Sequence, residues 1–256
     1  MAAAPGRDAA GAHQDSTAST SPGHPAARSA TEPGERALLG ALLVMTLLSG
    51  LIDGVCYLGL GRVFTANMTG NVVILGFAAA GAPGFSVTAS LTSLGLFLAG
   101  AVCGGRISGR VSRRSRLLTI GVALEATFVA AAAVVAFAAT TVSTGWARFT
   151  TIAILAFAMG IRNAVIRRLA VRDMTTTVLT MTLTGLAADS SLAGGLNPAA
   201  GRRAGAVLAM LIGAIAGAGL FLHRGASLPL AISAGLAGAT AVAIYVSPAA
   251  AYLDKK

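Results

Sequence analysis

The chain has few charged residues for its length, and this scarcity sets its class. Charged residues make up 11% of the 256 residues, whereas a soluble domain has about 25%. Hydrophobic residues make up 55% of the chain. The sequence therefore predicts an integral membrane protein, with the lipid bilayer as its main partner.

Alternation of apolar and polar residues is also missing. A membrane-spanning barrel needs such alternation along each strand, but segments such as residues 204–222 are continuously apolar. Crossing a hydrocarbon core of about 30 Å takes roughly 20 apolar residues in a helix. We therefore expect an all-α, polytopic helical membrane protein.

Cysteine and histidine are too scarce to suggest a metal site or common enzyme chemistry. Cys56 and Cys103 lie in separate apolar runs, which argues against a disulfide framework. The three histidines, His13, His24 and His223, form no HExxH motif or catalytic triad, and a P-loop is missing as well. We expect no cofactor, no metal and no enzymatic activity.

The net charge of +10 is interpreted as a topology signal rather than as a nucleic-acid footprint, because Lys and Arg collect in cytoplasmic loops. Residues 1–36 are rich in Ala, Gly, Ser, Thr and Pro and lack apolar periodicity. We expect them to form a disordered cytoplasmic tail, because the first apolar run begins too late and is too long for a signal peptide. Residues 37–253 are expected to form the membrane domain.

Six hydrophobic segments are candidates for full membrane spans. They are residues 37–60, 86–105, 117–141, 149–166, 204–222 and 226–253. Two further segments, residues 63–80 and 175–188, are interrupted by polar residues and Gly. The first of them is separated from the next span by the turn-forming residues 81–84.

The basic residues favour a topology in which both interrupted segments enter and leave on one side. With a cytoplasmic N-terminus, 15 of the 19 Lys and Arg residues then lie in the cytoplasm. If both segments cross fully, the chain has eight spans, and the tail, Arg202, Arg203 and both terminal lysines move outside. The positive-inside rule thus favours about six full spans plus two partial or broken helices, with both termini cytoplasmic and the protein in the inner membrane.

A short internal repeat accompanies the two interrupted segments. Residues 50–53, Gly-Leu-Ile-Asp, resemble residues 160–163, Gly-Ile-Arg-Asn, and residues 65–71 resemble residues 176–182. Each copy places a polar-interrupted helix before a segment rich in Thr and Asn. The alternative is chance similarity between apolar, Gly-rich segments.

The repeat divides the membrane domain into halves at about residues 37–141 and 149–253. In the six-span topology the first half starts at the cytoplasm and the second starts outside, so the repeat is inverted; with eight spans it is parallel. Inverted halves with broken helices that meet near the midplane are a recurrent plan of secondary transporters.

Residues around Asp53, the string Asn67-Met68-Thr69-Gly70-Asn71, residues 160–164 and residues 175–177 resemble the YoaK-like family of bacterial membrane proteins. The resemblance covers residues 37 to about 250, and the five-residue string is its most specific part. This family is still named as a domain of unknown function. It implies a multi-span inner-membrane protein and no particular substrate.

Asp53 and Glu125 are the acidic residues expected inside spans. A carboxylate in a span costs roughly 2.5–3.5 kcal/mol on insertion scales, so it faces a cavity, pairs with a cation or is protonated. We expect Asp53 to bind substrate or a proton and Glu125 to be a second candidate proton site. A structural ion pair is the alternative for each.

Arg162 and Asn163 occupy the repeat positions of Ile52 and Asp53. An Asp53–Arg162 pair across the two halves is one hypothesis, and extension of Arg162 to the membrane interface is the other. Proteins of the resembling family usually have Gln where this chain has Arg162, so the resemblance carries no neutral hydrogen-bonding role to this position.

Neutral polar residues supply further donors and acceptors in the interrupted segments. Such groups can bind a polar solute where helices break, or can simply join helices together. They are Asn67, Thr69, Asn71, Thr176, Thr177, Thr180, Thr182 and Thr184. Three pairs of glycines in GxxxG spacing are expected to pack helices closely. They are Gly50 with Gly54, Gly100 with Gly104, and Gly213 with Gly217.

The sequence favours a secondary transporter or permease for a small polar solute. Its expected substrate site is formed by Asp53, Asn67, Thr69, Asn71, Arg162 and Asn163. The alternative is a non-transporting membrane scaffold or assembly protein, and an intramembrane enzyme using Asp53 with another carboxylate is a third class. Homo-oligomerisation is left open.

Overall fold

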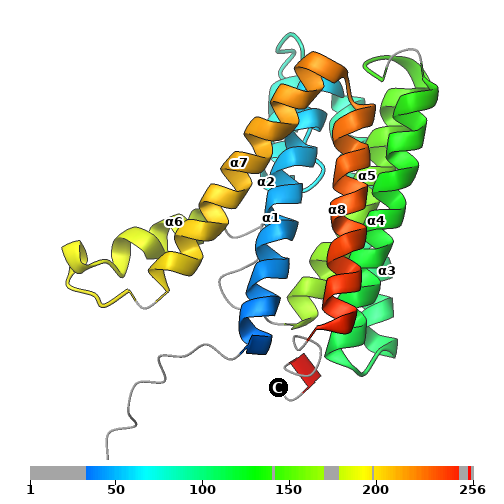
Figure 1. Ribbon diagram of the computed structural model, residues 1–256. Helices are drawn as coiled ribbons and strands as arrows, with labels where there is room; N and C mark the ends of the chain where they lie inside the picture. The colour runs from blue at the N-terminus through cyan, green and yellow to red at the C-terminus, as the bar shows by residue number, and fades with distance from the viewer. Residues whose placement is uncertain (1–32, 140–141, 170–178, 198, 248–252, 255–256) are drawn as a thin grey trace, which may run out of the picture. The chain divides into compact units, whose positions relative to one another are not determined.

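The computed structural model describes residues 33–139, 142–169, 179–197, 199–247 and 253–254. Within these ranges the regular secondary structure is helical (Figure 1). Its elements in chain order are α1 (Pro33–Gly59), α2 (Met68–Ala79), α3 (Val87–Arg110), α4 (Arg114–Ala138), α5 (Gly145–Leu169), α6 (Leu179–Ala188), the 3-10 helix η2 (Ser191–Ala193), α7 (Ala200–Arg224) and α8 (Ser227–Val246).

Six of these helices are long and apolar enough to cross a bilayer. They are α1, α3, α4, α5, α7 and α8, whereas α2 and α6 are shorter apolar helices. The prediction of an all-α, polytopic membrane protein is confirmed. The two short helices fall in the two segments that the sequence marked as interrupted.

Helix boundaries differ from the predicted ones at both ends of the membrane domain. The first helix begins at Pro33, inside the segment expected to be a disordered tail. Proline suits a first helical turn, and Glu35 interacts favourably with the positive end of the helix. The last long helix ends at Val246, because Ser247 precedes Pro248 and is biased away from helical geometry.

Extensive packing joins the long helices in three pairs, α1 with α7, α3 with α5, and α4 with α8. Figure 1 shows α7 lying along α1 while α8 lies beside α4. Each of these pairs combines one helix from the first half of the chain with one from the second. The two halves are therefore interleaved.

Glycines allow α1 and α7 to touch along their backbones. A methyl group added at Gly50 would lie closer than 3.0 Å to the carbonyl oxygen of Met210, and one at Gly213 would lie equally close to that of Leu47. The small residues of both helices thus face each other at the crossing. This is the close approach predicted from the GxxxG spacing.

The crossing of α3 and α5 is built in the same way. A methyl group added at Gly160 would collide with the carbonyl oxygen of Phe97, and one at Gly100 would collide with that of Phe157. Gly160 follows Gly50 by 110 residues. The two glycines make the same kind of backbone contact in two different helix pairs.

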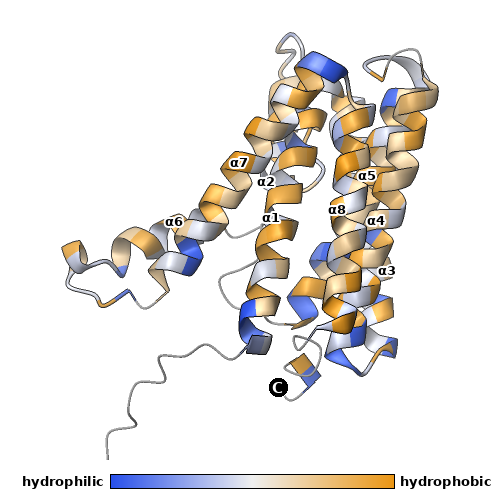
Figure 2. Cartoon of the chain, in the orientation of Figure 1, coloured by the Kyte–Doolittle hydropathy of each residue, from blue (hydrophilic) through white to orange (hydrophobic). Residues whose placement is uncertain are grey.

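Hydrophilic residues gather at the ends of α3, α4 and α5 that lie at the bottom of the view in Figure 2. Arg110 ends α3, and Arg114 begins α4 and donates a hydrogen bond to the carbonyl oxygen of Leu169 at the end of α5. Asp254 also reaches this end of α4. It accepts bonds from the Ser115 amide at 3.0 Å and the Ser115 hydroxyl at 2.8 Å, and these bonds lower the pKa of the Asp254 carboxyl from its ordinary value.

Candidate functional site

Asp53 lies in the second half of α1 and is 3% exposed. Its Oδ1 atom accepts hydrogen bonds from the backbone amides of Thr65 at 2.8 Å and Ala66 at 2.9 Å, and from the Thr65 hydroxyl at 3.3 Å. Both residues belong to the segment that leads from α1 into α2. The carboxylate therefore holds this segment against α1, and one of its two oxygens is used in doing so.

A tight reversal after α1 brings the segment back to Asp53. Gly61 and Arg62 both have positive φ, 92° and 58° respectively. For Arg62 this conformation costs about 1–2 kcal/mol, and its guanidinium stacks over the Phe85 ring at 5.3 Å. Arg148 on α5 fixes the turn by donating from Nε to the carbonyl oxygen of Leu60 at 2.9 Å.

Asn71 ties the same segment to α2 and α3. Its Oδ1 accepts from the Phe64 amide at 2.8 Å, and its Nδ2 donates to the Phe64 carbonyl at 2.6 Å and to the Ser93 hydroxyl at 3.0 Å. The side chain is fully buried, and the described lining of the neighbouring cavity does not include it. Asn71 therefore holds the segment in place rather than facing a ligand.

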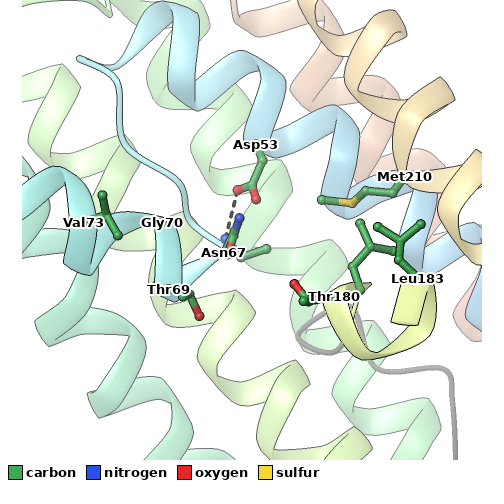
Figure 3. Close-up of a pocket in the computed structure, with 10 residues that line it drawn as sticks. Asp53, Asn67, Thr69, Gly70, Val73, Thr180, Leu183 and Met210 are labelled. Carbon is green, nitrogen blue, oxygen red and sulfur yellow. Dashed lines mark hydrogen bonds between the residues drawn. The ribbon is translucent and has the colours of Figure 1, made fainter. Parts of the chain in front are cut away.

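A cavity of about 300 Å³ lies beside Asp53, where the first turns of α2 and α6 meet α1 and α7 (Figure 3). Asp53 Oδ2 is buried and has no hydrogen-bond partner among the described residues. Three neutral polar side chains, Asn67, Thr69 and Thr180, stand around the same space. The remaining described lining residues are Ala66, Gly70, Val73, Leu179, Leu183 and Met210.

The start of α2 contributes to the polarity of this cavity. Asn67 is the N-cap residue of α2, but its side chain makes no capping hydrogen bond. The first amide that enters the bonding ladder of the helix is that of Asn71, which donates to the Asn67 carbonyl at 3.4 Å. The amides of the first turn precede that ladder, as at any helix N-terminus.

A second polar cluster lies between α1, α4 and α5. Arg162 on α5 is fully buried, and its Nη1 atom forms an ion pair with Glu125 Oε1 at 2.8 Å. The guanidinium also donates to the Ser49 hydroxyl at 2.6 Å and to the Met45 carbonyl at 3.3 Å. The two charges thus neutralise each other inside the protein, whereas Glu125 Oε2 and Arg162 Nε have no hydrogen-bond partner among the described residues.

The hypothesis of an Asp53–Arg162 pair is therefore corrected, because Arg162 pairs with Glu125 instead. Extension of Arg162 to the membrane interface is corrected too, since the side chain ends in the helix bundle. For Glu125 the structural ion pair is the alternative that the structure supports. The spacing of residues along the chain gave no way to see that α4 would present Glu125 to Arg162.

The predicted binding residues do not all gather in one site. Asp53, Asn67 and Thr69 come together at the cavity, whereas Arg162 lies in the ion-pair cluster. Asn163 follows Arg162, is half-buried, and has an Nδ2 atom without a hydrogen-bond partner among the described residues. Its role in binding stays a prediction.

The neutral threonines also separate. Thr180 lines the cavity, Thr182 is buried, and the Thr184 hydroxyl bonds back to the Thr180 carbonyl at 2.9 Å. Thr176 and Thr177 lie outside the described residues.

Several lining residues were not expected from the sequence. Leu183 and Met210 are ordinary apolar residues of helices, and nothing in their local pattern distinguishes them. Thr180 was grouped with the other threonines but not chosen as a site residue. Its alignment with Thr69 in the resemblance of residues 65–71 to residues 176–182 is the signal that could have selected it.

No metal centre is evident in the part of the chain that the structure describes, where three or more His, Cys, Asp or Glu side chains never gather. The oxygen atoms around the cavity come from one carboxylate, one amide and two hydroxyl side chains. The arrangement is suited to hydrogen bonding with a small polar molecule.

Six membrane-spanning helices with buried polar residues in their interior define a multi-pass membrane protein. The sequence matches the family described as "Protein of unknown function (DUF1275)" over residues 41–243, and the chain belongs to this family. It is also 34% identical over 152 residues to the UPF0700 transmembrane protein YoaK of Bacillus subtilis (strain 168). The aligned region covers 59% of this chain and 66% of that protein. No solved structure matches the chain.

Proposed function

We propose that the protein is a secondary transporter or permease of the inner membrane that moves a small polar solute through the cavity beside Asp53. The observation that carries the proposal is the Oδ2 atom of Asp53, which is buried at the cavity without a described partner. A carboxylate inside a membrane is costly, and such groups mark substrate or ion pathways. A role limited to holding the α1–α2 segment would leave this second oxygen unexplained.

The dimensions of the cavity support the same proposal. Its volume of about 300 Å³ lies at the lower end of the range for small-molecule sites. Its lining mixes a few polar groups with apolar side chains, which is the usual composition of such sites. Short helices that begin at the cavity also match the broken helices that form substrate sites in many transporters.

An internal repeat is part of the proposal, and matched contacts support it. Thr69 and Thr180 are 111 residues apart, match in the repeat alignment, and line the same cavity. The α1–α7 and α3–α5 crossings correspond as well, since the Gly217–Leu51 contact matches that of Gly104 with Ile161. Leu51 and Ile161 are 110 residues apart, as are Gly50 and Gly160.

Inverted halves follow if six helices cross the membrane, because three spans per half is an odd number. The proposed topology places the N- and C-termini in the cytoplasm, with α2 on the outer side and α6 on the cytoplasmic side. Two single-cysteine variants, Ala80→Cys and Ser191→Cys, test it in cells, because both positions are exposed. A membrane-impermeant maleimide should label the Ala80→Cys variant from outside and the Ser191→Cys variant only after the membrane is opened; the reverse in both variants would refute the topology.

Flux through reconstituted vesicles tests transport directly. Proteoliposomes would be mixed with a hyperosmotic step of glycerol, urea, methylammonium chloride or sodium acetate, and volume recovery followed by light scattering. We expect faster recovery than in protein-free vesicles for at least one solute, and loss of that gain in Asp53→Asn. Asp254→Asn, an exposed carboxylate outside the cavity, is the matched control and should behave as wild type.

The outcome that contradicts transport is also defined. If every solute gives the same recovery with and without protein, the transporter proposal fails. It also fails if Asp53→Asn destabilises the protein while solute flux stays at the wild-type level. The polar residues would then serve only to hold helices together.

A further inference from the structure

We propose that the cavity beside Asp53 selects a small organic cation, such as a compound with a primary ammonium group. The cationic group would pair with the Oδ2 atom of Asp53, which has no hydrogen-bond partner among the described residues. This inference names the substrate class of the site above and therefore rests on the proposed function. It is drawn from the charge around the cavity and from how each oxygen of Asp53 is used.

The negative charge of the cavity comes from Asp53. Among its described lining residues Asp53 alone is charged, and the other polar side chains, Asn67, Thr69 and Thr180, are neutral. A carboxylate in surroundings of low dielectric constant attracts a cation much more strongly than it would in water. Asn67, Thr69 and Thr180 can also accept hydrogen bonds from the N–H groups of an ammonium compound.

Two arginines in the described part of the chain have acidic partners of their own. The buried guanidinium of Arg162 is paired with Glu125, and Arg203, which borders α6, binds Asp189 at 2.6 Å and the Gly185 carbonyl at 2.9 Å. Neither of these arginines forms a salt bridge with Asp53. A cationic ligand can form one.

The partial positive charges of the helix ends at the cavity do not cancel the negative charge of Asp53. A helix N-terminus carries about half a positive charge, and that of α2, which begins at Met68, lies beside the cavity. Thr180 in the first turn of α6 is exposed. The partial charge at the N-terminus of α6 is therefore screened by solvent and salt. When Asp53 is ionised, its full charge exceeds the partial charge of either helix end.

The shape of the site favours an organic cation over a bare ion. A space of about 300 Å³ is far larger than a metal ion, and apolar side chains, Val73, Leu183 and Met210, form part of its wall. An alkyl group can contact these side chains while an ammonium group faces Asp53. Figure 3 shows Leu183 and Met210 on the other side of the cavity from Thr69 and Val73.

Charged thiol reagents can measure this selectivity without knowledge of the natural substrate. Thr69→Cys would be made in a Cys103→Ala background; Cys56 can stay because it is fully buried. In proteoliposomes or detergent, the rate of modification by the trimethylammonium reagent MTSET would be divided by the rate with the sulfonate MTSES. The same ratio at an exposed cysteine, Ala80→Cys, corrects for intrinsic reactivity.

We expect the corrected ratio for Thr69→Cys to favour the cationic reagent by at least about tenfold, because the opposite charges of the two reagents a few ångströms from a carboxylate give this factor even at the dielectric constant of water. Adding Asp53→Asn should bring it close to one, whereas adding Asp189→Asn should leave it high. Methylammonium chloride should slow modification of the Thr69→Cys thiol, and sodium acetate should not. A ratio near one while Asp53 is present, or protection by acetate rather than methylammonium, would overturn the cation assignment.

The result also separates this inference from the proposed function. If solute flux depends on Asp53 but the reagent ratio is near one, transport stands and the cation class is wrong. If the ratio is high and Asp53-dependent while no solute crosses, the site binds cations and the transporter proposal fails.

Discussion

The α1–α7 and α3–α5 crossings share their backbone contacts but differ in the polar residues beside them. In each, glycines on both helices face carbonyl oxygens of the partner. Next to the first crossing α1 carries Asp53, which borders a cavity. Next to the second, α5 carries Arg162, which is sealed in an ion pair with Glu125.

The difference separates packing from chemistry. The close crossings need only small residues, so both helix pairs can use the same solution. A charge needs either a partner or access to water or ligand, and the two helices meet that need differently. The Arg162 cluster pairs its charge within the protein, while the Asp53 carboxylate borders a cavity and has no described cationic partner.

The largest loss of stability is expected from breaking the ion pair between Arg162 and Glu125. Glu125→Leu leaves Arg162 buried without its counter-ion, and we expect it to destabilise the protein by about 3–5 kcal/mol. The double variant Glu125→Leu/Arg162→Leu should recover most of this loss, because it removes both charges. Denaturant unfolding in detergent, followed by circular dichroism, measures both; equal stability of Glu125→Leu and wild type would show that the pair contributes little.

The contrast between the clusters also shows what the sequence could predict. The six spans and two short helices were predictable, because length and hydropathy are local properties. Asp53 was predictable as a cavity residue, since a lone carboxylate in a span needs a cavity or a partner. Its bonds to Thr65 and Ala66 were not, because they depend on the reversal at Gly61. The pairing of Glu125 with Arg162 depends on which faces of α4 and α5 meet.

A smaller effect tests whether the two crossings are equivalent. Gly213→Val on α7 and Gly100→Val on α3 each force a side chain against a backbone carbonyl, and we expect each to cost about 1–3 kcal/mol or more. Gly219→Val and Gly95→Val, on the same helices with nothing within 4 Å, are matched controls. Thermal unfolding compares the four; a large cost at one crossing alone would break the correspondence.

Asp53→Asn should have a still smaller effect on stability. The Asn side chain keeps an oxygen that can accept from the amides of Thr65 and Ala66. Those bonds weaken without the charge, but the cost of burying a charge is also removed, so we expect a change below about 1 kcal/mol. The same unfolding measurement applies, and a loss as large as that of Glu125→Leu would show that Asp53 contributes to stability as much as the ion pair does.

The smallest effect on stability is expected at Asp254, an exposed carboxylate that accepts hydrogen bonds from Ser115 at the start of α4. Its bonds from Ser115 lower its native pKa, so they stabilise the fold fully above the ordinary pKa of 3.8 and are lost as the pH falls through the lower native value. Asp254→Asn should lower the melting temperature slightly at pH 7, and the difference from wild type should vanish in strong acid. Melting curves over a pH series provide the check, and a difference that grows on acidification would have the wrong sign.

The interleaving of the two halves has a consequence for how the protein is made. Because α1 packs on α7 and α3 packs on α5, the glycine faces of the first helices have no partner while the ribosome is still synthesising the second half. When Arg162 enters the membrane, Glu125 and Ser49 have already been inserted and can receive it. Biogenesis therefore proceeds through partly inserted chains whose helices must wait for late partners, and truncation before α7 leaves α1 without the neighbour that covers it.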